Sequence, residues 1–332
     1  MTLKKALFPT LLLTAFLMAA CAVNSETEDY YSQDRVMKAW MNCNYPGLTP
    51  YGNTGAYVID MVKGEGTPVT DSSYIRVFYT KRTLDGDITS TNDQELAEQL
   101  GEYAKSYWYG GNTWRVDQGY LPEALETVLK TMRAGGRLKM ALPASASSHD
   151  YSLYDAFTST SESDNQIIDL TIDTVITDIY AYQEKAMRQW FTEHYQVSDT
   201  TVEHLYFKKL EEHSSESDTV SDGATVSVWY IGRMMNGQVF DTNIEDTAKF
   251  YRIWSNAGNY EALSISYEKE SADRFKENNS VVDGFGKAVL QMNYEEKAVT
   301  LFSSELGYGD SGSNPAIPEY SPLVFWLWIE KK

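Results

Sequence analysis

The C-terminal part of this chain carries aromatic side chains in an order that could line one small pocket. Tyr230, Phe240, Phe285 and Phe325 each stand beside a valine, isoleucine or glycine, and Asp241 directly follows Phe240. A pocket of this composition holds an apolar group and uses a few polar groups to orient it. These residues therefore favour binding chemistry at an apolar site with one carboxylate at its rim.

Other kinds of chemistry are excluded by the residues present. The four histidines are scattered without metal-ligand spacing, and the sequence has no Gly-rich phosphate loop and no Ser-His-Asp arrangement. We therefore expect no metal and no cofactor. The formal net charge of -19 disfavours nucleic acid as a partner and adds repulsion from anionic lipid head groups.

Six short segments in fixed order resemble the FKBP family of peptidyl-prolyl isomerases, the macrolide-binding immunophilins. They are VSVWYIG at 226–232, NGQVFD at 236–241, VVDGF at 281–285, LGYG at 306–309, IP at 317–318 and LVF at 323–325. Each segment alone is weak, and the set in this order is specific. The resemblance is strong over about 125 residues and weak over about 125 more, and 125 residues is an ordinary size for one domain.

The resemblance implies a role for each site residue. Tyr230, Asp241 and Tyr308 would act on the peptide, Asp241 by polarising the site and Tyr308 through its hydroxyl. The expected substrate-binding residues are Phe240, Phe250, Val281, Val282, Phe285, Ile317 and Phe325. The backbone N–H of Val282 would bind a substrate carbonyl, and Tyr251 is an alternative to Phe250 as a wall aromatic.

Such a pocket suits rotation about an X–Pro bond. The barrier of this amide is about 18–20 kcal/mol, and it arises from resonance that twisting breaks. Twisting also reduces the amide dipole, so an apolar pocket favours the twisted state over the planar one. No nucleophile and no proton shuttle is required.

Three departures from the family pattern stand out. Phe285 replaces the usual Trp, and Glu295 replaces a Gly after the helix, which predicts a different turn there. The segment 254–280 is longer than usual. It carries Tyr260, Tyr267 and Phe275, and we interpret it as a flap or a partner-binding insert.

The N-terminus has the features of an export signal. Lys4 and Lys5 precede the apolar run 6–20, which ends in the small residues before Cys21. This pattern is typical of a bacterial lipoprotein, with 1–20 as signal peptide and Cys21 as the lipidated residue. We therefore expect a lipid anchor in the outer membrane of the cell envelope, on its periplasmic or surface face, and a membrane partner through that anchor alone.

Hydrophobic periodicity divides the rest of the chain into two halves of similar pattern. The expected organisation is a tether with a short helix at 21–50, a first domain at 51–178, a helical linker at 179–204 and a second domain at 205–332. Each half reads strand, strand, helix, strand, strand, with a repeat offset of about 150–160 residues. We predict an α+β fold of two FKBP-like domains, each a bent antiparallel sheet wrapped over one helix.

The first half lacks the pocket residues. Thr89 and Ser90 stand where the second half has Phe240 and Asp241, and Leu125 replaces the floor aromatic, although Tyr79 is present. This half is expected to keep the fold without the chemistry. Spacing, dimerisation and client binding remain its possible roles.

Three functions remain open at this point. The first is a peptidyl-prolyl isomerase that assists exported proteins, with proline-containing peptides or unfolded proteins as partners. The second is a non-catalytic FKBP-like chaperone or binding lipoprotein. The third is a structural or glycan-binding surface lipoprotein, for which the abundant Tyr and Trp are the motive.

Overall fold

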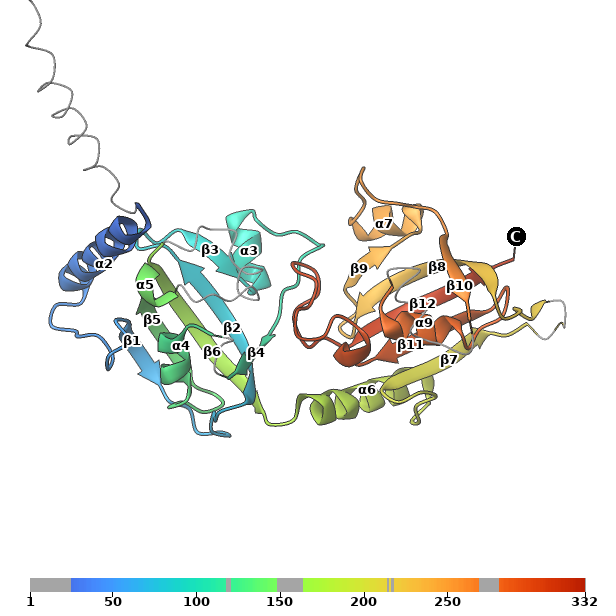
Figure 1. Ribbon diagram of the computed structural model, residues 1–332, viewed down its shortest axis with the longest axis horizontal. Helices are drawn as coiled ribbons and strands as arrows, with labels where there is room; N and C mark the ends of the chain where they lie inside the picture. The colour runs from blue at the N-terminus through green and yellow to red at the C-terminus, as the bar shows by residue number, and fades with distance from the viewer. Residues whose placement is uncertain are drawn as a thin grey trace, which may run out of the picture.

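A computed structural model describes residues 25–117, 121–147, 164–213, 215, 218–268 and 281–331. It contains two α+β domains that lie side by side, each built on one six-stranded antiparallel sheet (Figure 1). The expected fold class is confirmed. Cys21 and Phe275 lie outside the described residues.

The described residues of the first domain form six strands and four helices. Its strand order is β1-β5-β6-β2-β3, and β4 also pairs with β2. The strands are β1 (Tyr57–Val62), β2 (Ser73–Arg82), β3 (Ile88–Thr91), β4 (Asn112–Val116), β5 (Arg137–Leu142) and β6 (Gln166–Ile176). The helices are α2 (Ser25–Asn44), α3 (Gln94–Leu100), α4 (Glu123–Leu129) and α5 (Ala144–Ser147).

The second domain has the same topology. Its strand order is β10-β8-β12-β11-β7, and β9 also pairs with β8. The strands are β7 (Leu205–Glu211), β8 (Ala224–Met234), β9 (Val239–Thr242), β10 (Leu263–Tyr267), β11 (Lys297–Phe302) and β12 (Leu323–Glu330). The helices are α6 (Ile179–Tyr195), α7 (Glu245–Tyr251), α9 (Asp283–Val289) and the 3₁₀ turn η2 (Ser304–Leu306).

Strand register shows the internal repeat directly. In the first domain Ile75 pairs with Trp114, and in the second Val226 pairs with Ile265, so both partners are displaced by 151 positions. At the central helices and the next strand the displacement is 160, because α4 begins at Glu123 and α9 at Asp283; at the last strand it is 157, because Leu170 pairs with Tyr79 and Leu327 with Tyr230. The second domain is therefore nine residues longer between β10 and α9.

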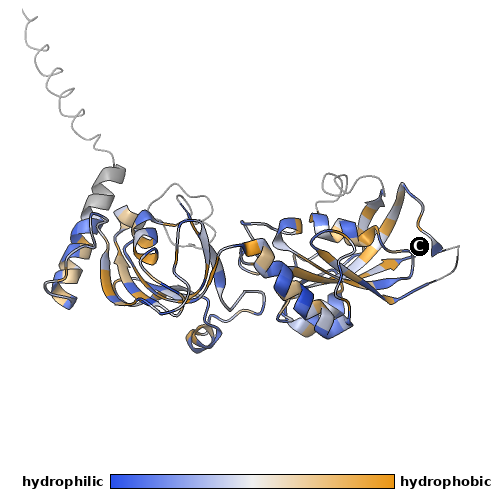
Figure 2. Ribbon diagram, turned by 90° about the horizontal axis from the view of Figure 1, so that it is seen from below, coloured by the Kyte–Doolittle hydropathy of each residue, from blue (hydrophilic) through white to orange (hydrophobic). Residues whose placement is uncertain are grey.

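Each sheet is covered on both faces, because alternate strand residues are apolar and must be removed from water. The helices α4 and α9 pack on one face of their sheets and form the main cores. On the opposite faces, α2 contributes Met37 and Met41, and α6 contributes Met187 and Phe191. The solvent side of α6 is largely hydrophilic (Figure 2). Thus α6, expected as a linker, packs as part of the second domain.

Some elements differ from the sequence expectation. The strands β3, β4 and β10 and the helices α3 and α7 were not predicted, because short edge elements carry little periodic signal. Within the expected insert 254–280, Ile265 and Tyr267 are buried, and the Tyr267 hydroxyl donates to the carbonyl oxygens of Leu290 and Met292 at 3.0 Å. That part is a sheet strand and not a flap.

The turn at Glu295 also differs from the expectation. Glu295 has φ of +62°, and its N–H donates to the Ile329 carbonyl at 2.7 Å. Gly135, 160 positions earlier, has φ of +80°, and its N–H donates to the Ile172 carbonyl at the same distance. The glycine-type turn is therefore retained, with glutamate in the left-handed conformation.

The two domains touch along the β11–β12 connection, residues 303–322. The N–H of Trp108 donates to the Pro315 carbonyl at 2.8 Å, and Tyr74 packs edge-on against Tyr320. Figure 1 shows this connection between the two sheets.

No helix among the described residues is long and apolar enough to cross a membrane.

Candidate active site

The four aromatic residues predicted from the sequence lie together on the α9 face of the second sheet. Phe325 on β12 is their centre, with ring centroids 5.6 Å from Phe240, 5.2 Å from Phe285 and 6.0 Å from Tyr230. The Phe240 and Phe285 contacts are edge-to-face, the geometry that the ring quadrupoles favour. Three strands and one helix thus converge on one aromatic cluster.

A carboxylate and two phenols form the polar rim of this cluster. The Tyr230 hydroxyl donates to Asp241 Oδ2 at 2.6 Å, and Asp241 is exposed. Burial, followed by the charge of Asp241, raises the pKa of Tyr230 far above its usual value. Burial and Asp241 also raise the pKa of Tyr308, which is 40 % exposed. Both phenols therefore stay protonated and can donate hydrogen bonds at neutral pH.

Two neighbours fix the position of Tyr230 and Phe240. Asn243 Oδ1 accepts from the Tyr230 N–H at 2.8 Å, and Asn243 Nδ2 donates to the Val228 carbonyl at 2.9 Å. A Cβ on Gly232 would lie 2.6 Å from the Phe240 ring and 3.0 Å from that of Phe325. Glycine at this position is what lets the two rings approach the strand.

The segment from Leu306 to Ile317 closes another side. Gly309 has φ of +60°, and its N–H donates to the Ser304 carbonyl at 2.8 Å, so the chain reverses just after Tyr308. Ile317 is buried in the same apolar cluster as Phe285 and Phe325. The LGYG motif therefore presents Tyr308 at the rim, and Ile317 packs below it.

The remaining predicted residues divide into two groups. Val281 and Val282 pack against the cluster at the N-terminal end of α9, where the first helical N–H groups lack intrahelical acceptors. Phe250, by contrast, is 78 % exposed and packs edge-on against Tyr251. Tyr251 in turn accepts a hydrogen bond from Arg233. The Phe250 ring therefore lies apart from the aromatic cluster.

Sequence reasoning missed several residues of this site. Phe302 is fully buried and stacks on Phe325, with centroids 5.7 Å apart, and a Cβ on Gly284 would meet its ring. Asn243 could have been found from the repeat, because Asn92 makes the same two hydrogen bonds to Tyr79 and Val77. Trp108 packs on the cluster from the first domain, which no local pattern could indicate.

The first domain keeps the backbone arrangement of this site, but different side chains stand at most of its positions. Tyr79 and Ser90 stand 151 positions before Tyr230 and Asp241, with their hydroxyl oxygens 3.4 Å apart. Lys81, at the position of Gly232, is buried, and its ammonium lies 5.9 Å from the centre of the Tyr79 ring. The first domain therefore has the Lys81 side chain at the position where Gly232 in the second domain leaves room for the Phe240 ring.

The chemistry open to the second-domain site is limited by its composition. Its described residues offer aromatic walls, one carboxylate and two phenol donors, and no described group of His, Cys, Asp and Glu forms a metal site. Such a site can desolvate an amide and orient its carbonyl.

Comparison with known proteins finds relatives of the second domain. Residues 216–329 match the family model described as FKBP-type peptidyl-prolyl cis-trans isomerase. A probable FKBP-type isomerase from Haemophilus influenzae is 25 % identical over 126 residues, which cover 38 % of this chain and 42 % of that protein. The FK506-binding protein 1A of Aspergillus fumigatus is 27 % identical over 118 residues, covering 36 % of this chain and 86 % of that protein.

One solved structure aligns across both domains. The structure of the three FKBP domains of wheat FKBP73 covers 84 % of this chain and 95 % of its own, at 17 % identity and a TM-score of 0.29. The chain spans less than half the length of the Haemophilus relative that it matches.

Proposed function

Because residues 216–329 form an FKBP-type peptidyl-prolyl cis-trans isomerase domain, we propose that the whole chain catalyses prolyl isomerisation in exported proteins as they fold. The observation that carries this proposal is the aromatic cluster around Phe325 with the Tyr230–Asp241 pair at its rim. Its substrates would be unfolded proteins or peptides that contain proline.

The proposed mechanism uses the site residues as follows. The proline ring enters against Phe240, Phe285 and Phe325, where water is excluded and the less polar twisted amide is favoured. The backbone N–H of Val282 and the Tyr308 hydroxyl donate to peptide carbonyls. The hydrogen bond from the Tyr230 hydroxyl to Asp241 holds the Tyr230 ring beside Phe325. Preorganised donors of this kind stabilise a transition state without further reorganisation.

Isomerisation of a tetrapeptide with one X–Pro bond tests the proposal, together with proline-limited refolding of a protein. We expect Tyr308→Phe and Asp241→Asn to lower kcat/KM about tenfold, or about 1.4 kcal/mol, because the first removes a hydroxyl donor and the second replaces a charged acceptor with a weaker neutral one. Tyr182→Phe is the matched control, since Tyr182 is 39 % exposed on α6, away from the cluster. Wild-type protein that accelerates neither reaction at micromolar concentration would refute the enzyme.

The chaperone alternative predicts a different result in the same variants. The grounds for this alternative are two departures from the family pattern, Glu295 and the long segment 254–280. Glu295 nevertheless keeps a turn of the glycine type. A pure chaperone would suppress aggregation equally well in wild type, Tyr308→Phe and Asp241→Asn, with no isomerase activity in any of them.

We further propose that the protein is lipid-anchored through Cys21 in the outer membrane. The apolar run 6–20 and the small residues before Cys21 support this anchor. Expression of wild type and Cys21→Ser, followed by separation of membranes, measures it. The wild-type protein should be found with the outer membrane and the variant in the soluble envelope fraction. Equal distribution of both would argue against lipidation.

A further inference from the structure

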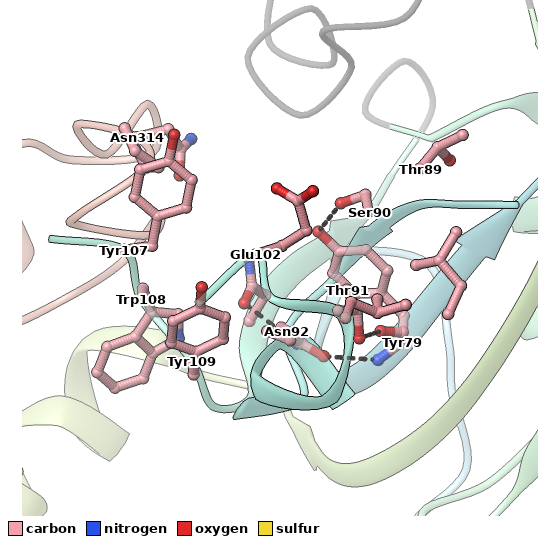
Figure 3. Close-up of a pocket in the computed structure, with 15 residues that line it drawn as sticks. Tyr79, Thr89, Ser90, Thr91, Asn92, Glu102, Tyr107, Trp108, Tyr109 and Asn314 are labelled. Carbon is pink, nitrogen blue, oxygen red and sulfur yellow. Dashed lines mark hydrogen bonds between the residues drawn. The ribbon is translucent and has the colours of Figure 1, made fainter. Parts of the chain in front are cut away.

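A cavity lies in the first domain, beside the second domain and apart from the aromatic cluster described above. Its volume is about 630 Å³, within the range of about 300–1,000 Å³ usual for ligand sites. Figure 3 shows Tyr107, Trp108 and Tyr109 on one side of it, and Tyr79 and Ser90 on the other.

This cavity occupies the place in the first domain that the candidate active site occupies in the second. Tyr79 and Ser90, which line it, correspond to Tyr230 and Asp241. Asn92, a third lining residue, holds the Tyr79 N–H as Asn243 holds that of Tyr230. The cavity therefore lies at the point of the first sheet that corresponds to the aromatic cluster of the second.

The phenylalanines of the second-domain cluster have no counterparts in the first domain, and polar side chains join the aromatic residues that line the cavity. Thr89 stands where the second domain has Phe240, and Ile168 and Leu125 stand at the positions of Phe325 and Phe285. Hydroxyl and amide groups of Ser90 and Asn112 now line the cavity. These groups can pair with the N–H and C=O groups of an extended backbone, which an aromatic wall cannot satisfy.

The second domain completes one side of the cavity. Asn314 and Pro315 line it, while Ile317 of the same connection packs in the apolar cluster of the isomerase domain. The Trp108 N–H holds Pro315, and Gln238 Nε2 donates to the Tyr107 carbonyl at 2.7 Å. The β11–β12 connection therefore contributes residues both to this cavity and to the aromatic cluster, so one extended polypeptide that follows this connection would contact both.

Charge narrows the occupant further. Glu102 is the charged residue among those that line the cavity, and the whole chain carries a net charge of -19. A polyanion would be repelled at such a surface. The lining side chains fit a neutral or cationic segment that carries some apolar groups. Leu100 and Tyr107 line the cavity and are exposed, so they can contact those apolar groups.

We propose that this cavity is a second client site, which binds an extended segment of the unfolded polypeptide whose prolyl bond lies in the isomerase domain. The site binds without catalysis, because the first domain has no counterpart of Phe240, Phe285 and Phe325 and no carboxylate at the position of Asp241. This inference rests on the proposed isomerase function for its client class. It adds a subsite that raises the effective concentration of the client at the second domain.

The test uses the full chain with two readouts. The first is fluorescence anisotropy of a labelled, proline-free, neutral peptide of about 15 residues, long enough to span a pocket of this size. The second is the ratio of kcat/KM in protein refolding to kcat/KM on the tetrapeptide, which fills one pocket only. Tyr107→Ala removes a ring that is 47 % exposed, and Thr89→Trp fills the cavity; Tyr182→Ala is the matched control.

We expect Tyr107→Ala and Thr89→Trp to weaken binding of the proline-free peptide about tenfold and to lower the refolding-to-tetrapeptide ratio by a similar factor through KM. Tyr182→Ala should retain the wild-type values. Wild-type affinity and ratio in both cavity variants would overturn the second site, as would binding of a neutral oligosaccharide, abolished by Tyr107→Ala, in place of the peptide. If the tetrapeptide is not turned over at all, the proposed function fails, and the anisotropy measurement still decides this inference.

Discussion

At the scale of single residues, the site depends on one glycine as much as on its aromatic rings. Gly232 stands on β8 beneath Phe240 and Phe325, and its homologous position in the first domain holds Lys81. The absence of a side chain is what lets two rings lie against the strand. A substitution of this glycine therefore tests whether the position of the Phe240 ring is needed for activity.

We predict that Gly232→Ala lowers kcat/KM on the tetrapeptide at least tenfold. The new methyl group would overlap the Phe240 ring at 2.6 Å and push it out of the cluster. Overpacking of this kind also costs about 1–3 kcal/mol of stability, measurable by urea unfolding. Adding Phe240→Leu should recover most of that stability but not the activity. Full activity in Gly232→Ala would show that the Phe240 ring is dispensable.

The sequence allowed the aromatic set to be predicted because each member follows a family motif along the chain. Phe302 and Asn243 were missed for opposite reasons. Phe302 reads as an ordinary buried strand residue and becomes part of the site only through its stacking on Phe325. Asn243 is a hydrogen-bonding residue whose role becomes clear when its two backbone partners are seen beside those of Asn92.

At the scale of elements, the turn after the central helix shows how a local rule can be overridden. A glutamate in the left-handed region costs about 1–2 kcal/mol relative to a glycine. Glu295 keeps this conformation because its N–H bonds Ile329 and its Oε1 accepts from the Lys331 N–H at 2.7 Å. Residue type alone predicted a different turn, whereas the β12 strand beside it determines the conformation.

Glu295→Gly should therefore raise the free energy of unfolding, by about 1 kcal/mol, after allowance for the lost bond to Lys331. The reciprocal change, Gly135→Ala in the first domain, should lower stability by about the same amount, since φ there is +80° and no atom crowds the site. Thermal unfolding of both variants measures this. A destabilised Glu295→Gly would mean that the carboxylate contact outweighs the backbone strain.

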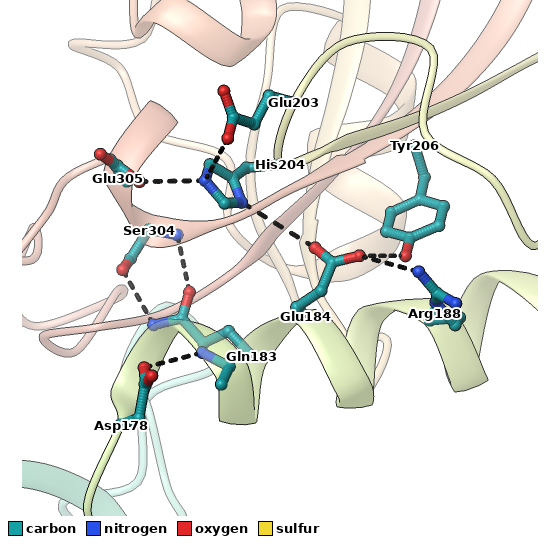
Figure 4. A network of polar contacts seen from close by, with 10 residues as sticks. Asp178, Gln183, Glu184, Arg188, Glu203, His204, Tyr206, Ser304 and Glu305 are labelled. Carbon is teal, nitrogen blue, oxygen red and sulfur yellow. Dashed lines mark hydrogen bonds and ion pairs between the residues drawn. The ribbon is translucent and has the colours of Figure 1, made fainter.

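The helix α6 positions the element that carries Tyr308. Gln183 is buried, its Nε2 donates to Ser304 Oγ at 2.9 Å, and its Oε1 accepts from the Ser304 N–H at 2.9 Å (Figure 4). Its Nε2 also donates to the Tyr320 carbonyl at 3.1 Å. These three bonds fix both ends of the connection that bears Tyr308. The hydrophobic periodicity predicted the helix, but it could not indicate the polar contacts that Gln183 makes.

We predict that Gln183→Ala lowers stability by about 2–3 kcal/mol, because buried donors and acceptors lose their partners. It should also lower kcat more than it changes KM, since Tyr308 loses its support. Gln189→Ala is the matched control, because Gln189 is exposed and its Nε2 donates to Glu193 Oε1 on the same helix at 2.9 Å. Unchanged unfolding and kinetics in Gln183→Ala would contradict this role.

At the scale of the whole molecule, the contact between the domains contains a buried acid. Glu319 lies in the β11–β12 connection, next to Tyr320, which packs on Tyr74 of the first domain. Burial raises the pKa of Glu319 to about 8. Its charge also contributes to the raised pKa of Tyr79, about 12, for which burial is the main cause. The interface is therefore sensitive to pH through one carboxyl group.

The sign of this dependence follows from proton linkage. The folded state binds a proton at Glu319 that the unfolded state releases above its ordinary pKa of 4.5, so stability falls as pH rises from about 4.5 to about 8. We expect a loss on the order of 3 kcal/mol between pH 5 and pH 8. Glu319→Gln should remove this loss, whereas Glu261→Gln, at an exposed site, should keep it. Parallel pH profiles for wild type and Glu319→Gln would exclude Glu319 as the cause.

The overall arrangement was only partly predictable from the sequence. Strongly alternating strands such as β2 and β5 and the helix pattern of α6 were found, because their periodicity exceeds any local alternative. The contact of Trp108 and Pro315 joins residues that are far apart in the chain and belong to irregular segments. Such contacts depend on how two finished domains meet, which periodicity does not encode.

The position of α6 also decides where this protein can be cut. A fragment that starts at 205 would contain every strand of the second sheet and would leave Tyr206, Val299 and Trp326 bare on the face that Met187 and Phe191 cover. An uncovered apolar face of this kind promotes self-association. Any soluble fragment of the catalytic half must therefore begin before Asp178, upstream of the first turn of that helix.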